Sequence, residues 1–216
     1  MLLTSLFALT AFILNWFAAC GCTFVTLALA YGNPSDPSSL DLHFGIWFYQ
    51  AWTVVSSLGG SVVFKGCWGY PDYVELDGYM KSARAFSTMA LIVGAGFMFA
   101  DAIASCTAAN TGGRRAASAS SQGVGYMVAC LFCGLSLLLL QSEVCTDNDL
   151  SEQFKAIFPN MSFDTAACGI ATGAKCAISA TVFYFLASVS SLYAYKLEQA
   201  VTPIRSEGLD EPLVQE

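Results

Sequence analysis

The sequence predicts a membrane protein with an all-α four-helix bundle and a small extracellular antiparallel β-sheet. Its composition sets the class, because 56% of the residues are hydrophobic, only 12% are charged and the mean hydropathy is +0.58, whereas about a quarter of the residues are charged in soluble domains. Four uncharged apolar runs approach the roughly 20 residues that a helix needs to cross a bilayer. Between the first two runs lies a stretch that is rich in aromatic and β-branched residues and favours strands.

The four apolar runs define one domain over residues 1–196, followed by an acidic cytoplasmic tail over residues 197–216. The predicted transmembrane helices cover about 5–30, 84–108, 123–141 and 169–195, and the connections cover about 31–83, 109–122 and 142–168. With four crossings, both termini share one side with the short connection. The two long loops share the other side.

The first run has a second interpretation as a signal peptide. No charged residue precedes Asp36, and the sequence from Phe17 to Cys20 resembles a lipoprotein cleavage box. A basic segment at the amino terminus is missing, however, and the apolar run continues past Cys20. We therefore expect a membrane-spanning helix.

The orientation is predicted from the long loops, because basic residues nearly balance on the two sides and the positive-inside rule does not decide. The second loop contains the N-glycosylation sequon at Asn160, and cysteines stand in polar context at Cys67, Cys145 and Cys168. Both features are typical of a surface outside the cytoplasm. We therefore expect a plasma-membrane protein with both termini in the cytoplasm.

The first long loop predicts a β-hairpin. The stretches from Phe44 to Val55 and from Ser61 to Trp68 favour strands, and the small residues from Ser56 to Gly60 favour a turn. Because a lone hairpin is only marginally stable in water, we expect it to join further strands from both long loops and to rest on the outer ends of the helices.

The same loop carries a pattern that resembles the claudin superfamily, which includes the claudins and the peripheral myelin protein group. The pattern comprises the tryptophan motif, a cysteine, a tyrosine and an arginine at the start of the second helix: Gly45, Ile46, Trp47, Cys67, Tyr70 and Arg84. The resemblance implies a sheet-capped four-helix bundle with a structural and adhesive function. It also implies lateral assembly with copies of itself and contact with partners on an apposed membrane.

The chain departs from this family pattern in two places. The family's first loop cysteine should follow the tryptophan closely, but the sequence there reads Phe48, Tyr49, Gln50. We therefore expect the family's first-loop disulfide to be absent. The sequence ends at Glu216 and lacks the apolar last residue of a PDZ ligand, so we expect no PDZ scaffold as a partner.

The nine cysteines divide by environment. The preferred disulfide joins Cys145 to Cys168 across the second loop. Cys67 is then left over, with three alternatives: a free thiol, a bond to Cys176 or a different pairing with Cys168. The remaining cysteines fall in or beside predicted helices, where we expect packing roles; these are Cys20, Cys22, Cys106, Cys130 and Cys133.

The sequence favours no enzymatic activity and no cofactor. The Cys130–Cys133 pair is similar in spacing to the motif of four-helix thiol oxidoreductases such as vitamin K epoxide reductase, but its apolar surroundings do not favour a reactive thiolate. His43 is the single histidine, and no metal-ligand pattern is present. Asp101 is expected at the inner membrane interface. A net charge of −7 argues against nucleic acid as a partner.

Two functional classes remain. In the first, the protein assembles in the membrane and contributes to cell contacts or to a paracellular barrier, with Phe48, Tyr49 and Trp52 as candidate contact aromatics. The acidic long loops then favour a cation path. In the second, it is an accessory subunit or organiser of a channel, receptor or wall-building complex. Both need a tightly packed bundle, for which Gly169, Gly173, Ala177 and Thr181 supply small residues.

Overall fold

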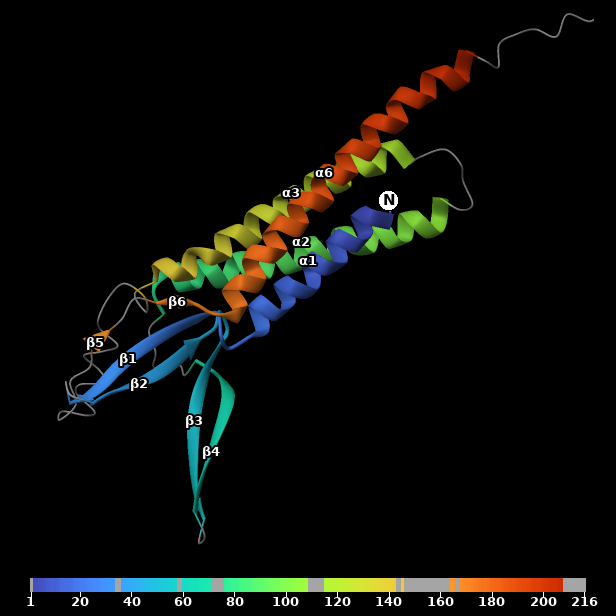
Figure 1. Ribbon diagram of the computed structural model, residues 1–216. Helices are drawn as coiled ribbons and strands as arrows, with labels where there is room; N and C mark the ends of the chain where they lie inside the picture. Colours follow the sequence, from blue (N-terminus) through green and yellow to red (C-terminus); the bar gives the residue numbers. More distant parts are fainter. Residues whose placement is uncertain are drawn as a thin grey trace, which may run out of the picture.

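The computed structural model contains four long helices and a small antiparallel sheet at one end of them (Figure 1). It describes residues 2–33, 36–57, 60–70, 76–108, 115–142, 145, 164–165 and 168–207. The helices are α1 (Leu2–Cys20), α2 (Gly78–Ala108), α3 (Arg115–Leu135) and α6 (Thr172–Glu207), and a 3-10 helix, η1 (Ser136–Gln141), extends α3. We call the end of the bundle that carries the sheet the sheet end.

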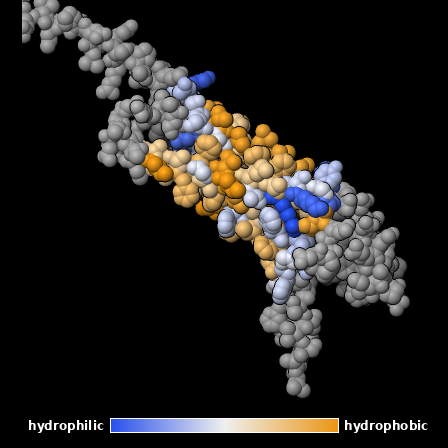
Figure 2. Space-filling model, turned by 180° about the vertical axis from the view of Figure 1, so that it is seen from behind, coloured by the Kyte–Doolittle hydropathy of each residue, from blue (hydrophilic) through white to orange (hydrophobic). Residues whose placement is uncertain are grey.

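The described residues include four helical segments that are long and apolar enough to cross a membrane: Leu3–Cys20, Gly78–Ala104, Ser120–Gln141 and Thr172–Leu197. On the face seen in Figure 2, hydrophobic residues dominate the middle of the bundle, and hydrophilic residues appear toward its two ends. An apolar outer surface is what lipid tails require of a helical bundle. The prediction of a multi-pass membrane protein with four apolar helices and a small antiparallel sheet is confirmed.

The sheet is built from two hairpins that meet over a short distance. Its strands are β1 (Val25–Asn33), β2 (Asp36–Phe44), β3 (Phe48–Ser57), β4 (Gly60–Gly69), β5 (Asp164–Thr165) and β6 (Gly169–Ile170). The order is β4-β3-β2-β1-β5, and β6 also pairs with β1. The two hairpins join through only two residue pairs, His43 with Gln50 and Phe44 with Tyr49. They therefore diverge away from the bundle (Figure 1).

The predicted hairpin in the first loop is present as β3 and β4, which pair in antiparallel register from Phe48 with Gly69 to Ser57 with Gly60. The expected additional strands are also present, because β5 and β6 come from the second loop and pair with β1.

The predicted end of the first transmembrane helix was wrong. Helix α1 ends at Cys20, and strand β1 already begins at Val25. The apolar residues after Cys20 alternate instead, since Val25 and Leu27 are buried while Thr26 between them is partly exposed. This period of two belongs to a strand. The apolar run continued because one face of β1 packs against the bundle.

The other three helices also differ from their predicted boundaries. Helix α2 begins six residues earlier than predicted, because the Asp77 carboxylate caps it by accepting a 2.9 Å hydrogen bond from the Met80 backbone N–H. Helix α3 begins at Arg115, inside the predicted linker. At the other end of the chain, Gly169 lies in β6 and not in a helix. Helix α6 runs from Thr172 to Glu207, so it continues past its predicted end at residue 195 into the predicted tail.

Small side chains allow the helices to pack closely. Helix α3 lies against α6 and α2, and α1 lies against α6 and α2. Alanines are completely or almost completely buried between them, namely Ala8, Ala11, Ala90, Ala129, Ala177, Ala180 and Ala187. Gly123 permits a further close approach, because a Cβ there would lie 2.7 Å from Cγ of Leu192 on α6. Such contacts drive helix association when the surroundings are already apolar.

One of these contacts makes a specific prediction. A Cβ at Gly94 of α2 would collide with the hydroxyl of buried Tyr184 on α6 and would lie 3.0 Å from its Cζ. Removing that hydroxyl would take away the atom nearest to the added methyl group. We therefore expect Gly94→Ala to lower the free energy of unfolding in detergent by about 1 kcal/mol, and Tyr184→Phe to restore most of the loss in the double variant.

Gly96→Ala is the matched control, because nothing lies within 4 Å of a Cβ at that position. Its unfolding temperature should stay close to that of the original chain. If the changes in the free energy of unfolding caused by Gly94→Ala and Tyr184→Phe simply add in the double variant, the added methyl group does not collide with Tyr184.

Candidate functional site

The residues of the sequence motif come together where the sheet meets α2. Gly45, Ile46 and Trp47 form the connection between β2 and β3, Tyr70 follows β4, and Arg84 lies in the second turn of α2. Direct interactions link these residues although Ile46 and Arg84 are 38 positions apart in the chain. We call Ile46, Trp47, Tyr70 and Arg84 the arginine clamp.

The guanidinium of Arg84 is the centre of the clamp. Its Nε donates a 2.8 Å hydrogen bond to the carbonyl oxygen of Ile46. Its Cζ lies 5.0 Å from the ring centroid of Trp47 and 5.0 Å from that of Tyr70. A cation over aromatic faces is attracted by the ring quadrupoles. One side chain of α2 therefore binds both the loop before β3 and the residue that follows β4.

Tyr70 closes the clamp from the other side. Its hydroxyl donates a 2.8 Å hydrogen bond to the carbonyl oxygen of Gly45, and its ring centroid lies 5.4 Å from that of Tyr49. Burial raises the pKa of the Tyr70 hydroxyl above its usual range, while the nearby Arg84 charge opposes this with a smaller effect. The hydroxyl therefore keeps its proton and remains a donor at neutral pH.

The loop itself is packed against the connection between α1 and β1. The backbone N–H of Gly45 donates a 2.7 Å hydrogen bond to the carbonyl oxygen of Phe48, and Phe24 N–H donates a 2.8 Å bond to the carbonyl oxygen of Phe44. The Ile46 side chain is completely buried in a cluster with Phe24 and Met80. This cluster joins strand, loop and α2 into one packed unit.

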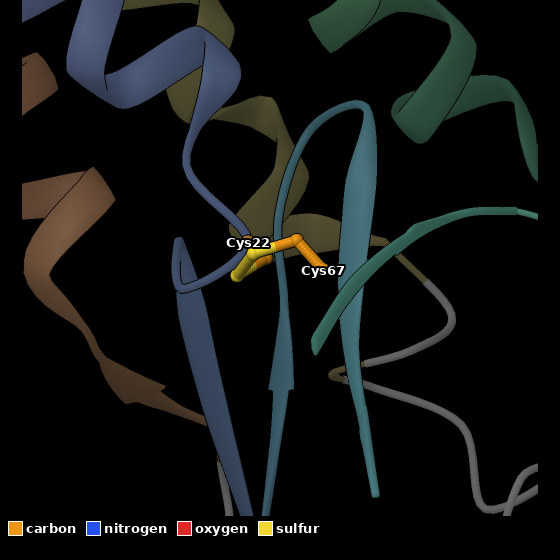
Figure 3. The surroundings of a disulfide bond; sticks show 2 residues. All are labelled: Cys22 and Cys67. Carbon is orange, nitrogen blue, oxygen red and sulfur yellow. A yellow bond between two sulfur atoms is a disulfide. The ribbon is translucent and has the colours of Figure 1, made fainter. Parts of the chain in front are cut away.

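A disulfide fixes the same unit covalently. Cys22, in the connection after α1, is bonded to Cys67 of β4, with 5.7 Å between their Cα atoms (Figure 3). Two predictions were wrong here. Cys22 is not a helical packing residue, and Cys67 is neither a free thiol nor bonded to Cys176 or Cys168. The Cys22–Cys67 bond differs from the family's first-loop disulfide, whose first cysteine should follow Trp47.

The second disulfide joins Cys145 to Cys168, the pair preferred from the sequence, with 5.2 Å between Cα atoms. Both cysteines pack against the buried cluster that contains Ile46 and Met80. Cys176, one of the alternatives for Cys67, is a free thiol that packs against the same cluster. Neither alternative partner of Cys67 is therefore used.

The candidate contact aromatics have different environments. Phe48 is exposed, but Tyr49 is partly buried and packs against Tyr70, so its ring belongs to the interior of the site. The side chain of Trp52 and the sequon residue Asn160 lie outside the part of the chain whose side chains the structure describes.

Polar groups inside the bundle interact with neighbouring helices. Cys130 and Cys133 of α3 donate 3.4 Å hydrogen bonds to the carbonyl oxygens of Thr181 and Ala177 on α6. Asp101 of α2 accepts a hydrogen bond from the Tyr126 hydroxyl of α3. Asp101 therefore has a hydrogen-bond partner on a neighbouring helix. From the sequence, Asp101 was expected at the inner membrane interface, and this partner was not predicted.

The clamp makes a prediction that isolates the Arg84 side chain. We expect Arg84→Ala to lower the free energy of unfolding by about 2 kcal/mol, because a charge-assisted hydrogen bond and two cation–π contacts are lost together. Arg84→Lys should recover only part of this, since an ammonium cannot reproduce the planar guanidinium. Thermal unfolding of the detergent-solubilised protein measures both effects.

Lys81→Ala is the matched control, because Lys81 is an exposed cation in the first turn of the same helix. An equal loss of stability for Lys81→Ala and Arg84→Ala would mean that the guanidinium contacts do not hold the sheet.

The site connects the first loop to three other parts of the structure. It joins the first loop to α1 through a disulfide, to α2 through Arg84 and to the buried cluster through Ile46. A search with protein-family models and a search of curated proteins both find no match to the chain.

Proposed function

We propose that the chain is a claudin-like structural membrane protein that assembles sideways with copies of itself and contributes to contacts between cells. One observation carries the proposal: the motif residues are joined into one unit by hydrogen bonds, cation–π contacts and the Cys22–Cys67 disulfide. A sheet held this firmly is suited to transmit contact forces to the bundle. In this proposal the sheet faces the cell exterior, and both termini lie in the cytoplasm of a plasma-membrane protein.

The divergence of the two hairpins supports an assembly function. Only two residue pairs join β2 to β3, so most of the β3–β4 hairpin extends beyond the rest of the sheet (Figure 1). A two-stranded hairpin is marginal alone, and unpaired strand edges readily add another chain. The hairpin is thus a candidate contact element, and Phe48 is exposed at its base.

Freeze-fracture imaging tests this function. Cells that lack intramembrane strands would express either the original chain or the Arg84→Ala variant, at matched surface levels. The proposal predicts continuous intramembrane strands at cell contacts for the original chain and fewer or broken strands for the variant. Dispersed particles, together with recovery of a stoichiometric complex with an unrelated channel or receptor after mild detergent extraction, would support the accessory-subunit alternative and contradict the proposal.

If strands form, the loop charges set a second expectation. Acidic residues outnumber basic residues in both long loops, and the acidic Asp41 is exposed on β2. A path lined by carboxylates favours cations. Cell layers that express the chain should therefore pass sodium in preference to chloride in dilution-potential measurements, and equal permeabilities would contradict the cation path.

A further inference from the structure

Large aromatic side chains are exposed at the sheet end of the bundle. Trp16 lies near the end of α1, Trp47 on the loop before β3, Trp68 on β4 and Tyr79 in the first turn of α2. Their exposed fractions are 52%, 41%, 53% and 52%. We call these four residues the aromatic belt.

The four rings come from four segments that meet at the sheet end. Trp68 is adjacent to Cys67, which is bonded to Cys22, and Cys22 is six residues after Trp16. Trp47 lies 5.0 Å from the Arg84 guanidinium. Arg84 is five residues after Tyr79, or about 7.5 Å along the helix. The disulfide and the clamp therefore bring all four rings to the junction between bundle and sheet.

The belt continues the apolar outer surface of the transmembrane helices. Exposed Phe17 adjoins Trp16 on α1, and Met89 and Ile92 extend the exposed apolar surface of α2 beyond Tyr79. Figure 2 shows the apolar surface of the bundle giving way to more hydrophilic residues near the sheet end. Trp and Tyr combine an apolar ring with an N–H or O–H group, and they concentrate where lipid tails meet the headgroups.

We propose that the aromatic belt lies in the lipid headgroup layer, so that the base of the β3–β4 hairpin rests on the bilayer surface. The occupant of this surface is lipid, because the belt continues a surface that lipid already covers and its rings carry the polar tips that headgroups bind. The part of the hairpin beyond Trp68 then stands clear of the membrane.

The chain supplies its own control for this proposal. Trp68 pairs with Tyr49, whereas Trp52 pairs with Lys65 three residues farther along the hairpin. Three residues of strand correspond to about 10 Å. Trp52 is therefore placed beyond the belt on the same hairpin, and the two tryptophans report on two distances from the bundle.

The experiment uses two single-tryptophan variants of the full chain in phosphatidylcholine vesicles, one retaining Trp68 and the other Trp52, with the remaining tryptophans replaced by phenylalanine. Brominated lipids that carry bromine near the headgroup end of the acyl chain should quench Trp68 about threefold more strongly than Trp52. Aqueous iodide should quench Trp52 more strongly than Trp68. An intact Cys22–Cys67 bond, shown by mass spectrometry, verifies that each variant is folded.

Two outcomes would overturn the proposal. Equal access of iodide to both tryptophans, with weak bromolipid quenching of Trp68, would show that the belt is in water. Protection of Trp68 from both quenchers, lost when the lipid-to-protein ratio is raised, would show that a second copy of the chain covers it.

A measurement on the unsubstituted chain keeps the proposal testable if a variant misfolds. The four tryptophans can be labelled with fluorotryptophan and observed by fluorine NMR in the same vesicles. Headgroup spin-labelled lipid should broaden the resonances of the three belt tryptophans, and a soluble gadolinium chelate should broaden that of Trp52 most. The reverse pattern would contradict the proposal.

Discussion

Removing the Cys22–Cys67 disulfide is expected to cost more stability than any other change considered for this chain. The bond joins residues 45 positions apart, and a loop of this length corresponds to about 4 kcal/mol in the chain-entropy account of disulfide stabilisation. We expect the double variant Cys22→Ala with Cys67→Ala to unfold at markedly lower temperature in detergent and to expose the first loop to proteolysis. Thermal unfolding and limited proteolysis measure these effects.

Cys20→Ala is the matched control, because Cys20 is an exposed free thiol at the end of α1, two residues from Cys22. Its unfolding temperature should be nearly unchanged. A double variant that resists heat and protease as well as the Cys20→Ala control would show that the disulfide is not needed to hold the sheet on the bundle.

The second large effect is expected from Gly45→Ala, which loses no interacting side chain and adds a single methyl group. That methyl would collide with the carbonyl oxygen of Gly21 and would lie 2.6 Å from the carbonyl oxygen of Phe48 and 2.9 Å from Cα of Cys22. All three are backbone atoms, so no flexible side chain can move to relieve the contact. We expect a loss of about 3 kcal/mol in the free energy of unfolding, as for severe overpacking.

Gly69→Ala tests whether the loss is specific to this position, because nothing lies within 4 Å of a Cβ at Gly69, at the end of β4. The control variant should unfold like the original chain and should keep both disulfides. If Gly45→Ala is equally stable, the close contact between the Gly45 loop and the segment after α1 does not exist in solution.

Much of the fold could be predicted because the relevant signals are local. Uninterrupted apolar runs predict spanning helices whatever their partners, and the β-branched stretches around a flexible turn predict the β3–β4 hairpin. The end of α1 could not be predicted in this way. Residues after Cys20 are apolar whether they contact lipid or the buried cluster, and only their pairing with Asp36–Phe44 makes them a strand.

The candidate site was predicted in part. Trp47, Tyr70 and Arg84 were identified by resemblance, and the structure brings them into contact. The disulfide of Cys22 was not predicted, because Cys22 was assigned to a transmembrane helix, where a cysteine is expected to be a small packing residue. A usable signal was present, since Thr23, Val25 and Thr26 are β-branched residues that favour a strand immediately after Cys22.

The burial of Ile46 and the pairing of Asp101 with Tyr126 had no comparable sequence signal. Ile46 is buried because Phe24 and Met80, from two other segments, meet it at the junction. Tyr126 reaches Asp101 because α3 packs beside α2. Contacts of this kind depend on the arrangement of the helices and cannot be inferred from the spacing of residues along one of them.

The central claim is that the Cys22–Cys67 disulfide and the contacts of Arg84 hold the first loop on the bundle. Disulfide mapping tests this claim most directly. The protein, purified from membranes with free thiols blocked by alkylation, would be digested without reduction and its linked peptides identified by mass spectrometry. We predict peptides that join Cys22 to Cys67 and Cys145 to Cys168, with Cys20 and Cys176 alkylated. An alkylated Cys22, with Cys67 free or bonded to Cys168 or Cys176, would contradict the claim.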